Sequence, residues 1–177
     1  MLPAPAGSGK RTLTAGLVSR GWRLLSDELT LITQAGMIQP IARPISLKNR
    51  SIEVIRDFAP DAFIGKVVTD TIKGTVAHMR APADSVARVM ESATPGWIIF
   101  PKFVADAPAR LEPAERSHAF IELAENAFNY SLQGAEGFLR LGNLIDCTEA
   151  HHFSYGNLEE EVAMFDQLAR AKLNAYR

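Results

Sequence analysis

The stretch Pro5-Ala6-Gly7-Ser8-Gly9-Lys10-Arg11-Thr12 runs directly into a segment with helical periodicity, and it decides the fold class that we expect. Glycines let a backbone turn bring its N–H groups close to phosphate oxygens, and the N-terminus of the following helix adds partial positive charge. A lysine at the end of such a loop reaches the β- and γ-phosphates as a mobile cation. An accidental glycine-rich turn is the alternative interpretation. The predicted nucleotide-binding residues are Gly7, Ser8, Gly9, Lys10, Arg11 and Thr12.

Helical and strand patterns alternate along the rest of the chain. Apolar residues at spacings of three and four are typical of a helix that faces a core, as in the stripe Phe120, Leu123, Ala124, Ala127 and Phe128. We expect helices over 10–20, 51–58, 113–132, 134–145 and from 157 onward. We expect strands over 22–26, 29–33, 37–41, 75–79, 97–100 and 152–155. This mixture predicts an α/β fold, with α+β as the alternative.

Composition limits the classes of protein to which the chain can belong. It has 177 residues, 47% of them hydrophobic and 22% charged, which is typical of one globular domain over 1–177. A net charge of -1 gives no general attraction for nucleic acid. The longest apolar run, over 97–100, is far shorter than the ~20 residues of a membrane span. With no signal-peptide pattern and a single cysteine, Cys147, which we expect to be buried, the sequence predicts a cytoplasmic location.

The loop departs from the complete pattern G-x-x-x-x-G-K-[ST] in two ways. The first glycine is replaced by Ala4, and the Ser or Thr that holds Mg²⁺ is replaced by Arg11, which has no acceptor atom. Thr12 comes one residue late, so we expect weakened metal binding or lost catalysis. Only six residues precede Gly7, and two of them are prolines. We therefore expect the domain to lack the buried strand that normally enters such a loop.

Asp27 and Glu28 form an acidic pair at the end of the strand expected over 22–26. In open α/β sheets the carboxyl ends of the strands surround the ligand. A carboxylate there can hold Mg²⁺ or accept the proton of an attacking hydroxyl group. We therefore predict catalytic roles for Lys10 and Asp27, and metal ligation by Asp27, Glu28 and Thr12. A solvated turn with two ordinary acids is the alternative.

A few basic residues farther along the chain are weaker candidates for the same site. Arg43 and Lys48 flank a Pro-Ile-Ser-Leu segment, and Lys73 lies in a glycine-containing turn. Each could contact phosphate or an acidic group of a substrate, and a solvated surface cation is the alternative for each. His78 is a candidate proton relay if its strand borders the cleft, with a structural or exposed histidine as the alternative.

Two stretches resemble the HPr kinase/phosphorylase family, and more closely its bacterial HPr-kinase-related kinases. They are Gly7-Ser8-Gly9-Lys10 and residues 20–28, which read Arg-Gly-Trp-Arg-Leu-Leu-Ser-Asp-Glu. In that family a Gly-x-Gly-Lys-Ser loop is followed by a helix, an Arg-Gly turn and a strand that ends in Asp-Asp, or in Ser-Asp-Glu in the related kinases. The resemblance is specific over residues 2–34. It implies a P-loop phosphoenolpyruvate-carboxykinase-like nucleotide-binding fold, a mixed sheet with flanking helices.

The resemblance also implies an activity and roles for single residues. The activity is that of an ATP-dependent serine kinase, with ATP and Mg²⁺ as cofactors and a protein or peptide as substrate. A homo-oligomer is a further expectation about partners. Lys10 would bind the phosphates, Asp27 would be the general base, and Glu28 takes the place of the second aspartate. The family serine after the loop lysine is Arg11 here, and the family histidine upstream of the loop has no counterpart. Two other functions stay open: a nucleotide-binding regulatory module with impaired catalysis, and a small-molecule kinase.

Overall fold

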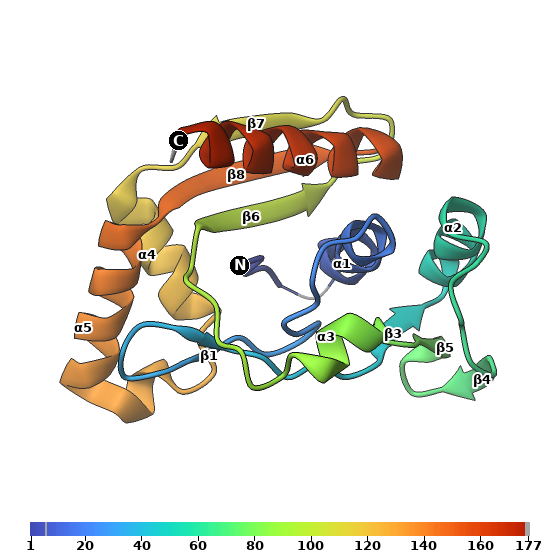
Figure 1. Ribbon diagram of the computed structural model, residues 1–177, viewed down its shortest axis with the longest axis horizontal. Helices are drawn as coiled ribbons and strands as arrows, with labels where there is room; N and C mark the ends of the chain where they lie inside the picture. Colours follow the sequence, from blue (N-terminus) through green and yellow to red (C-terminus); the bar gives the residue numbers. More distant parts are fainter. Residues whose placement is uncertain (6, 176–177) are drawn as a thin grey trace.

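A computed structural model describes residues 1–5 and 7–175 of the chain (Figure 1). Over that range the fold is mixed α/β, with six helices and three small sheets. The helices are α1 (Lys10–Ser19), α2 (Arg50–Phe58), α3 (Ala83–Ala87), α4 (Arg116–Glu125), α5 (Tyr130–Cys147) and α6 (Leu158–Ala175). The strands are β1 (Leu31–Ile32), β2 (Ile38–Gln39), β3 (Ile45–Lys48), β4 (Val68–Thr71), β5 (Gly74–Met79), β6 (Trp97–Phe103), β7 (Arg110–Pro113) and β8 (Glu149–Tyr155).

One sheet, in the order β6-β8-β7, carries helices on both faces. Strands β6 and β8 are parallel, and β7 is antiparallel to β8. Because successive side chains of a strand point to opposite faces, Ile99 of β6 packs with α1 and α6, whereas Ile98 packs with α4 and α5. The parallel pair matters for the site, because the carboxyl ends of β6 and β8 lie together at one edge of the sheet.

Helix α1 joins the two halves of the molecule, and it lies in the middle of the view in Figure 1. Leu13 and Leu17 face the sheet of β6 and β8, while Ala15 and Val18 pack against the cluster around β3, β5 and α2. Helix α6 approaches α1 closely at Gly16, where a Cβ would come within 2.7 Å of the end of the Leu158 side chain and would displace it. The loop before α1 is therefore held at the junction of both cores.

A second sheet, in the order β3-β5-β4, is antiparallel and lies beside α2. Its register pairs Ser46 of β3 with His78 of β5. Buried Ile45 and Leu47 alternate with Ser46 and Lys48, so the two polar side chains of β3 share the face away from the core. Strands β1 and β2 form the hairpin expected from the sequence, although each is only two residues long.

The first residues of the chain run beside β6. The Met1 nitrogen donates a hydrogen bond to the Trp97 carbonyl oxygen (2.6 Å), and the Met1 carbonyl accepts one from Ile99 N (2.9 Å). These two bonds to residues 97 and 99 have the spacing of a parallel ladder. The segment then leads the loop to the far end of β6, where Phe103 N donates to the Ser8 carbonyl (3.2 Å).

The strand expected over 22–26 is wrong. All five residues are described, and none is in a strand. Their backbone groups bond to three separate segments rather than to one neighbouring strand. Trp22 N donates to Leu17 O, Leu24 N donates to Ser85 Oγ, and Leu25 O accepts from Ile41 N. Apolar residues alone predicted a strand here, but a strand also needs a partner along its whole length.

Two expectations in the C-terminal half are also corrected. The helix expected over 113–132 ends at Glu125, because α4 (Arg116–Glu125) is followed by a turn before α5. Phe128 lies in that turn and is 93% exposed instead of facing the core. Cys147 is exposed rather than buried, because it is the last residue of α5. No helix in residues 1–5 and 7–175 combines the length and the apolar character that a membrane span needs.

Candidate functional site

The predicted phosphate loop lies at the carboxyl ends of β6 and β8. Gly7 and Gly9 both have left-handed backbone conformations, with φ of 88° and 82°, which favour glycine. The Ser8 carbonyl between them accepts hydrogen bonds from the Tyr155 hydroxyl (2.9 Å) and from Phe103 N (3.2 Å). A Cβ on Gly9 would collide with the Tyr155 hydroxyl, so this close contact also requires glycine. Ala6, in the middle of the predicted loop, lies outside the described residues.

Helix α1 begins with unpaired backbone donors. Its first intrahelical bond runs from Leu13 N to Gly9 O (3.1 Å), so the N–H groups of Lys10, Arg11 and Thr12 have no acceptor within the helix. No described side chain caps this end, and the first turn holds no acid. A pocket of about 430 Å³ opens there, and it includes all six predicted loop residues from Gly7 to Thr12 in its lining. Free N–H groups, the helix dipole and three cations (Lys10, Arg11 and Lys48) at one pocket suit an anion such as phosphate.

Lys10 is held over the loop. Its ammonium group donates a hydrogen bond to the Ala4 carbonyl (2.6 Å). Burial lowers the pKa of Lys10, and the nearby Arg11 lowers it further, while Glu28 acts in the opposite direction. A half-buried cation with one carbonyl partner can turn toward a phosphate at little cost, because it leaves no ion pair behind.

Arg11 points from the loop toward the acidic pair. Its Nη2 atom lies 3.2 Å from Glu28 Oε1, and its Nε atom lies 3.9 Å from Asp27 Oδ2. Asp27 and Glu28, predicted as metal ligands, thus share a guanidinium group. Thr12, the third predicted ligand, is on the wall of the loop pocket. Within the described part of the chain, no three His, Cys, Asp or Glu side chains gather as a metal site. In this arrangement the guanidinium group of Arg11 lies against both acids that were predicted to hold Mg²⁺.

Asp27 is tied to the second sheet. Its Oδ2 atom accepts a hydrogen bond from Ser46 N (3.1 Å) at the start of β3, and only 10% of its side chain is exposed. Asp27 lines a second pocket, of about 440 Å³, next to the loop pocket. The two pockets share four wall residues, which are Arg11, Glu28, Ser46 and Lys48. The phosphate loop and the predicted base thus face two adjoining spaces.

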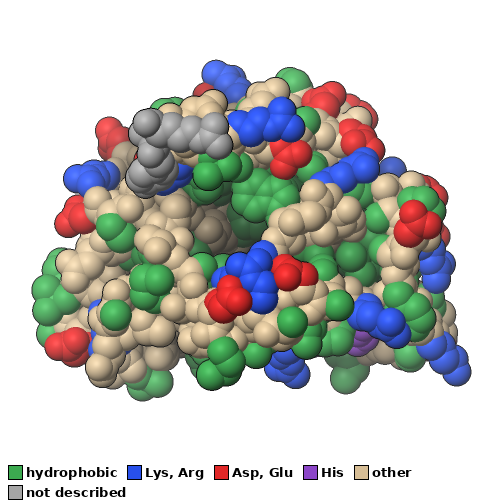
Figure 2. All heavy atoms as spheres, viewed as in Figure 1, with side chains coloured by type: hydrophobic (Ala, Val, Ile, Leu, Met, Phe, Trp, Pro, Cys, Tyr) green, Lys and Arg blue, Asp and Glu red, His purple; other side chains and the backbone are tan. Residues whose placement is uncertain are grey.

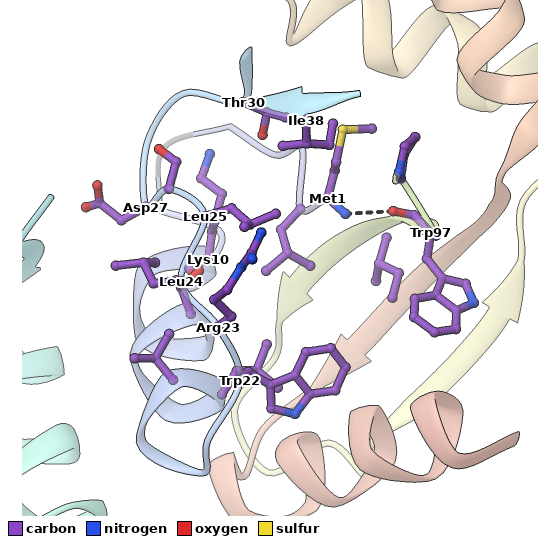
Figure 3. Close-up of a pocket in the computed structure, with 18 of the residues that line it drawn as sticks. Met1, Lys10, Trp22, Arg23, Leu24, Leu25, Asp27, Thr30, Ile38 and Trp97 are labelled. Atoms are coloured by element: carbon purple, nitrogen blue, oxygen red, sulfur yellow. Dashed lines mark hydrogen bonds between the residues drawn. The ribbon is translucent and has the colours of Figure 1, made fainter. Parts of the chain in front are cut away.

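A third cavity, of about 330 Å³, lies behind the loop between α1, residues 22–30 and β6 (Figure 3). Leu24, Ile38 and two tryptophans make much of its wall apolar, and Lys10 and Asp27 reach its edge. In Figure 3 the Asp27 side chain points away from the two tryptophans. The face drawn in Figure 2 is hollowed near its middle, with hydrophobic side chains on the upper wall of the hollow.

Sequence reasoning missed the residues that brace the loop from behind. Tyr155 was expected only as part of a strand, and neither its contact with Ser8 nor that of Phe103 follows from a local pattern. Ser46 was quoted only within a flanking segment, yet its N–H group fixes the Asp27 carboxylate. These contacts join residues more than 18 positions apart, so only the packing of the sheets brings them together.

A buried carboxyl group lies close to this support. Glu161, in the first turn of α6, is 2% exposed, and its Oε2 atom has no hydrogen-bond partner among the described residues. Burial raises the pKa of Glu161 to about 8, and the neighbouring Glu160 adds to the effect. Burial also raises the pKa of Tyr155, followed by the effect of Glu161.

Glu161→Gln is expected to stabilise the protein in alkaline solution. The folded carboxyl has a pKa of about 8 against an ordinary value of 4.5, so the folded state binds more protons between these pH values. The free energy of unfolding of the wild type therefore falls as the pH rises from about 4.5 to about 8. Gln removes this loss, and we expect a gain of about 2–4 kcal/mol at pH 8, measured by urea unfolding.

Glu160→Gln is the matched control, because Glu160 is exposed and belongs to the same turn. It removes only the smaller cause of the raised pKa of Glu161, so its gain in the free energy of unfolding at pH 8 is expected to stay well below that of Glu161→Gln. If the wild type and Glu161→Gln had parallel stability curves from pH 5 to pH 8, the carboxyl would not be buried in the protonated form.

The chain has no match among protein-family models, curated proteins or solved structures. The geometry of the loop and of the two adjoining pockets is therefore the basis for a functional proposal.

Proposed function

We propose that this chain is an ATP-binding phosphotransferase that transfers the γ-phosphate of ATP to a serine hydroxyl of a partner protein, in the manner of an HPr serine kinase. The observation that carries the proposal is the free N-terminus of α1 behind a glycine loop, at the carboxyl ends of two parallel strands. That position is where open α/β sheets bind ligands. A phosphoenolpyruvate-carboxykinase-like fold and a cytoplasmic location, where ATP is available, belong to the same proposal.

The phosphate groups of ATP fit the loop pocket. The N–H groups of residues 10–12 bind phosphate oxygens, and Lys10 leaves the Ala4 carbonyl to contact the β- and γ-phosphates. The Ser8 Oγ atom is buried without a hydrogen-bond partner in the described residues, so it is a further group available to the ligand. Binding at this place leaves the adjoining pocket free for the acceptor.

Asp27 is the proposed base, because it lines the adjoining pocket rather than the loop pocket. In the transfer step the serine Oγ atom forms a bond to the γ-phosphorus, and the bond between that phosphorus and the bridging oxygen of ADP breaks. The serine proton passes to the Asp27 carboxylate, and ADP leaves with the electrons of the broken bond. The hydrogen bond from Ser46 N fixes the carboxylate during this step.

A specific observation favours a second function, a nucleotide-binding regulatory module with impaired catalysis. Arg11 lies between the loop and both acids, and its guanidinium group contacts Asp27 and Glu28. A cation at this place offsets the negative charge of the Asp27 carboxylate and makes it a weaker proton acceptor. It also competes with Mg²⁺ for the same oxygens. The module would bind ATP through the loop and transfer no phosphate.

Lys10→Ala is expected to weaken ATP binding by about 10- to 100-fold, because the loop loses its one mobile cation. Isothermal calorimetry with the wild type and the variant measures the affinity. Lys102→Ala is the matched control, since Lys102 is exposed on β6 and lines none of the three cavities. Unchanged affinity in Lys10→Ala, or no ATP binding by the wild type, would contradict the proposal.

Transfer of ³²P from labelled ATP separates the candidate functions. Labelling of a partner protein or of serine peptides supports the kinase, whereas ATP binding with no labelling supports the regulatory module. Labelling of a free hydroxy compound with none of protein would identify a small-molecule kinase instead.

A further inference from the structure

The pocket that Asp27 lines carries more positive charge than the rest of the molecule would suggest. Arg43 comes from the segment before β3, Lys48 from the end of β3, and Lys73 from the turn between β4 and β5. His78 of β5 joins them on the same wall. The whole chain has a net charge of -1, so this gathering of cations is local.

The part of the chain that the structure describes offers these three cations no ion-pair partner. Among the described residues, Arg43, Lys48 and Lys73 form no ion pair and no side-chain hydrogen bond. The two acids of the pocket, Asp27 and Glu28, are both beside Arg11. Burial lowers the pKa of Lys48, and Arg11 and Lys73 lower it further, while Glu28 acts in the opposite direction. The pocket therefore holds four cations, counting Arg11, against two acids, and such an excess of positive charge favours an anionic ligand.

The turn that presents Lys73 is held in a fixed shape. Asn49 Oδ1 accepts a hydrogen bond from Thr75 N (3.0 Å), and Asn49 N donates one to the Thr75 carbonyl (2.9 Å). Gly74 has a φ of 81°, and a Cβ there would come within 2.5 Å of Asn49 Oδ1. The Thr71 hydroxyl closes the turn on the Gly74 carbonyl. Lys73 is thus placed by the same sheet that places Ser46 and Lys48.

We propose that this pocket binds an acidic peptide segment, so that the serine presented to Asp27 is flanked by Asp or Glu side chains. The proposal rests on the proposed function and names its class of substrate. Arg43, Lys73 and His78 are exposed, as an extended chain lying across the surface requires. A small free ligand is instead usually enclosed on most of its surface. Leu29, on the same wall and 51% exposed, offers an apolar contact between the charged ones.

Asp27 and the cations have different roles in this pocket. Asp27 faces the serine hydroxyl, while Arg43 and Lys73 contact carboxylates on either side of it in the peptide. Lys48 borders both pockets and so lies where the acceptor meets the phosphate of the donor. Charge pairing at exposed positions contributes mainly to the choice of partner.

A binding experiment tests the inference without requiring catalysis. The probes are fluorescently labelled peptides in which one serine is flanked by two Glu residues on each side. Fluorescence anisotropy compares their binding with that of versions that carry Gln or Lys in place of Glu. We expect the Glu peptide to bind at least about tenfold more tightly than the Gln peptide. We also expect its binding to weaken as salt is added. Lys73→Glu and Arg43→Glu should each weaken it by at least about tenfold.

Lys66→Glu is the matched control, because Lys66 is exposed near the same hairpin and lines none of the described cavities. It makes the same change of net charge and should leave peptide affinity unchanged within about twofold. Equal binding of the Glu and Gln peptides, or equal losses in Lys66→Glu and Lys73→Glu, would overturn the inference.

The ³²P assay with the same peptides keeps the two proposals apart. Phosphorylation that does not depend on peptide charge agrees with the proposed kinase function and contradicts the proposed acidic segment. Binding of the Glu peptide without any phosphorylation supports the acidic segment and counts against the kinase. Phosphorylation of glycerate or another free hydroxy acid, with no binding of the Glu peptide, overturns the peptide as occupant of the pocket.

Discussion

Asp27→Asn is expected to slow phosphoryl transfer by about 10²- to 10⁴-fold while ATP affinity changes by less than about twofold. The amide oxygen of Asn can still accept the hydrogen bond from Ser46 N, which Asp27 Oδ2 accepts at 3.1 Å. The variant therefore keeps the link between residues 22–30 and β3, and it loses the ability to take a proton together with the charge that faces Arg11 at 3.9 Å. Single-turnover transfer of ³²P measures the rate, and calorimetry measures the affinity for ATP.

Glu28→Gln is the control for this prediction. Glu28 is the neighbouring acid and contacts Arg11, but its side chain is 66% exposed and it is not the proposed base. Its loss should change the transfer rate by less than about threefold, because exposed ion pairs contribute little. A transfer rate in Asp27→Asn equal to that of the wild type would remove Asp27 from the mechanism. Equal large losses in both variants would point to the charge of the pair rather than to a base.

The sequence predicted the elements whose pattern is local. Helix α2 (Arg50–Phe58) matches the expected range 51–58 to within one residue, and α1 begins at Lys10 directly after the loop. Asn157 marks the start of α6, where its Oδ1 atom accepts a hydrogen bond from Glu159 N (2.9 Å). Helical periodicity and capping residues are short-range signals, and each element carries its own.

Elements that depend on a distant partner were not predictable in the same way. The Leu24-Leu25 region looked like a strand, but its backbone groups bond to Leu17, Ile41 and Ser85 instead. Its apolar side chains are explained by burial, as Leu24 is 2% exposed. Strand β7 (Arg110–Pro113) was missed for the opposite reason, since only its pairing with β8 makes this polar segment a strand.

The candidate site likewise combines motifs that are local in the sequence with contacts that depend on distant residues. The loop and the acidic pair were recognised as short motifs, and the structure brings them together through Arg11, Asp27 and Glu28. Lys73 was only a weak candidate, because sequence gives no measure of its nearness to Asp27. The antiparallel register of β3, β5 and β4 brings its turn to the pocket. Register is set by long-range pairing and by the burial of alternate residues, such as Ile45 and Leu47.

Arg11→Ser is expected to make ATP binding depend on Mg²⁺. In the wild type the guanidinium group contacts Asp27 and Glu28 and offers no acceptor to a metal. Serine supplies a hydroxyl oxygen at the position where a phosphate loop usually holds Mg²⁺, and it frees both carboxylates. It also removes a positive charge, so ATP without metal should bind more weakly. The ratio of the ATP affinities with and without Mg²⁺ is therefore expected to rise at least about tenfold, as measured by calorimetry.

Arg11→Lys separates the loss of charge from the gain of a ligand. Lysine keeps the positive charge and still has no acceptor atom. The ratio of the ATP affinities of Arg11→Lys with and without Mg²⁺ should therefore stay near that of the wild type. If Arg11→Ser and the wild type showed the same ratio, the guanidinium group would not be what keeps Mg²⁺ from the acids. If Arg11→Ser also gained phosphoryl transfer to serine peptides from an inactive wild type, the chain would be a regulatory module whose catalysis Arg11 suppresses. If transfer by an active wild type fell in both variants, Arg11 itself would be the cation that stabilises the transferred phosphate.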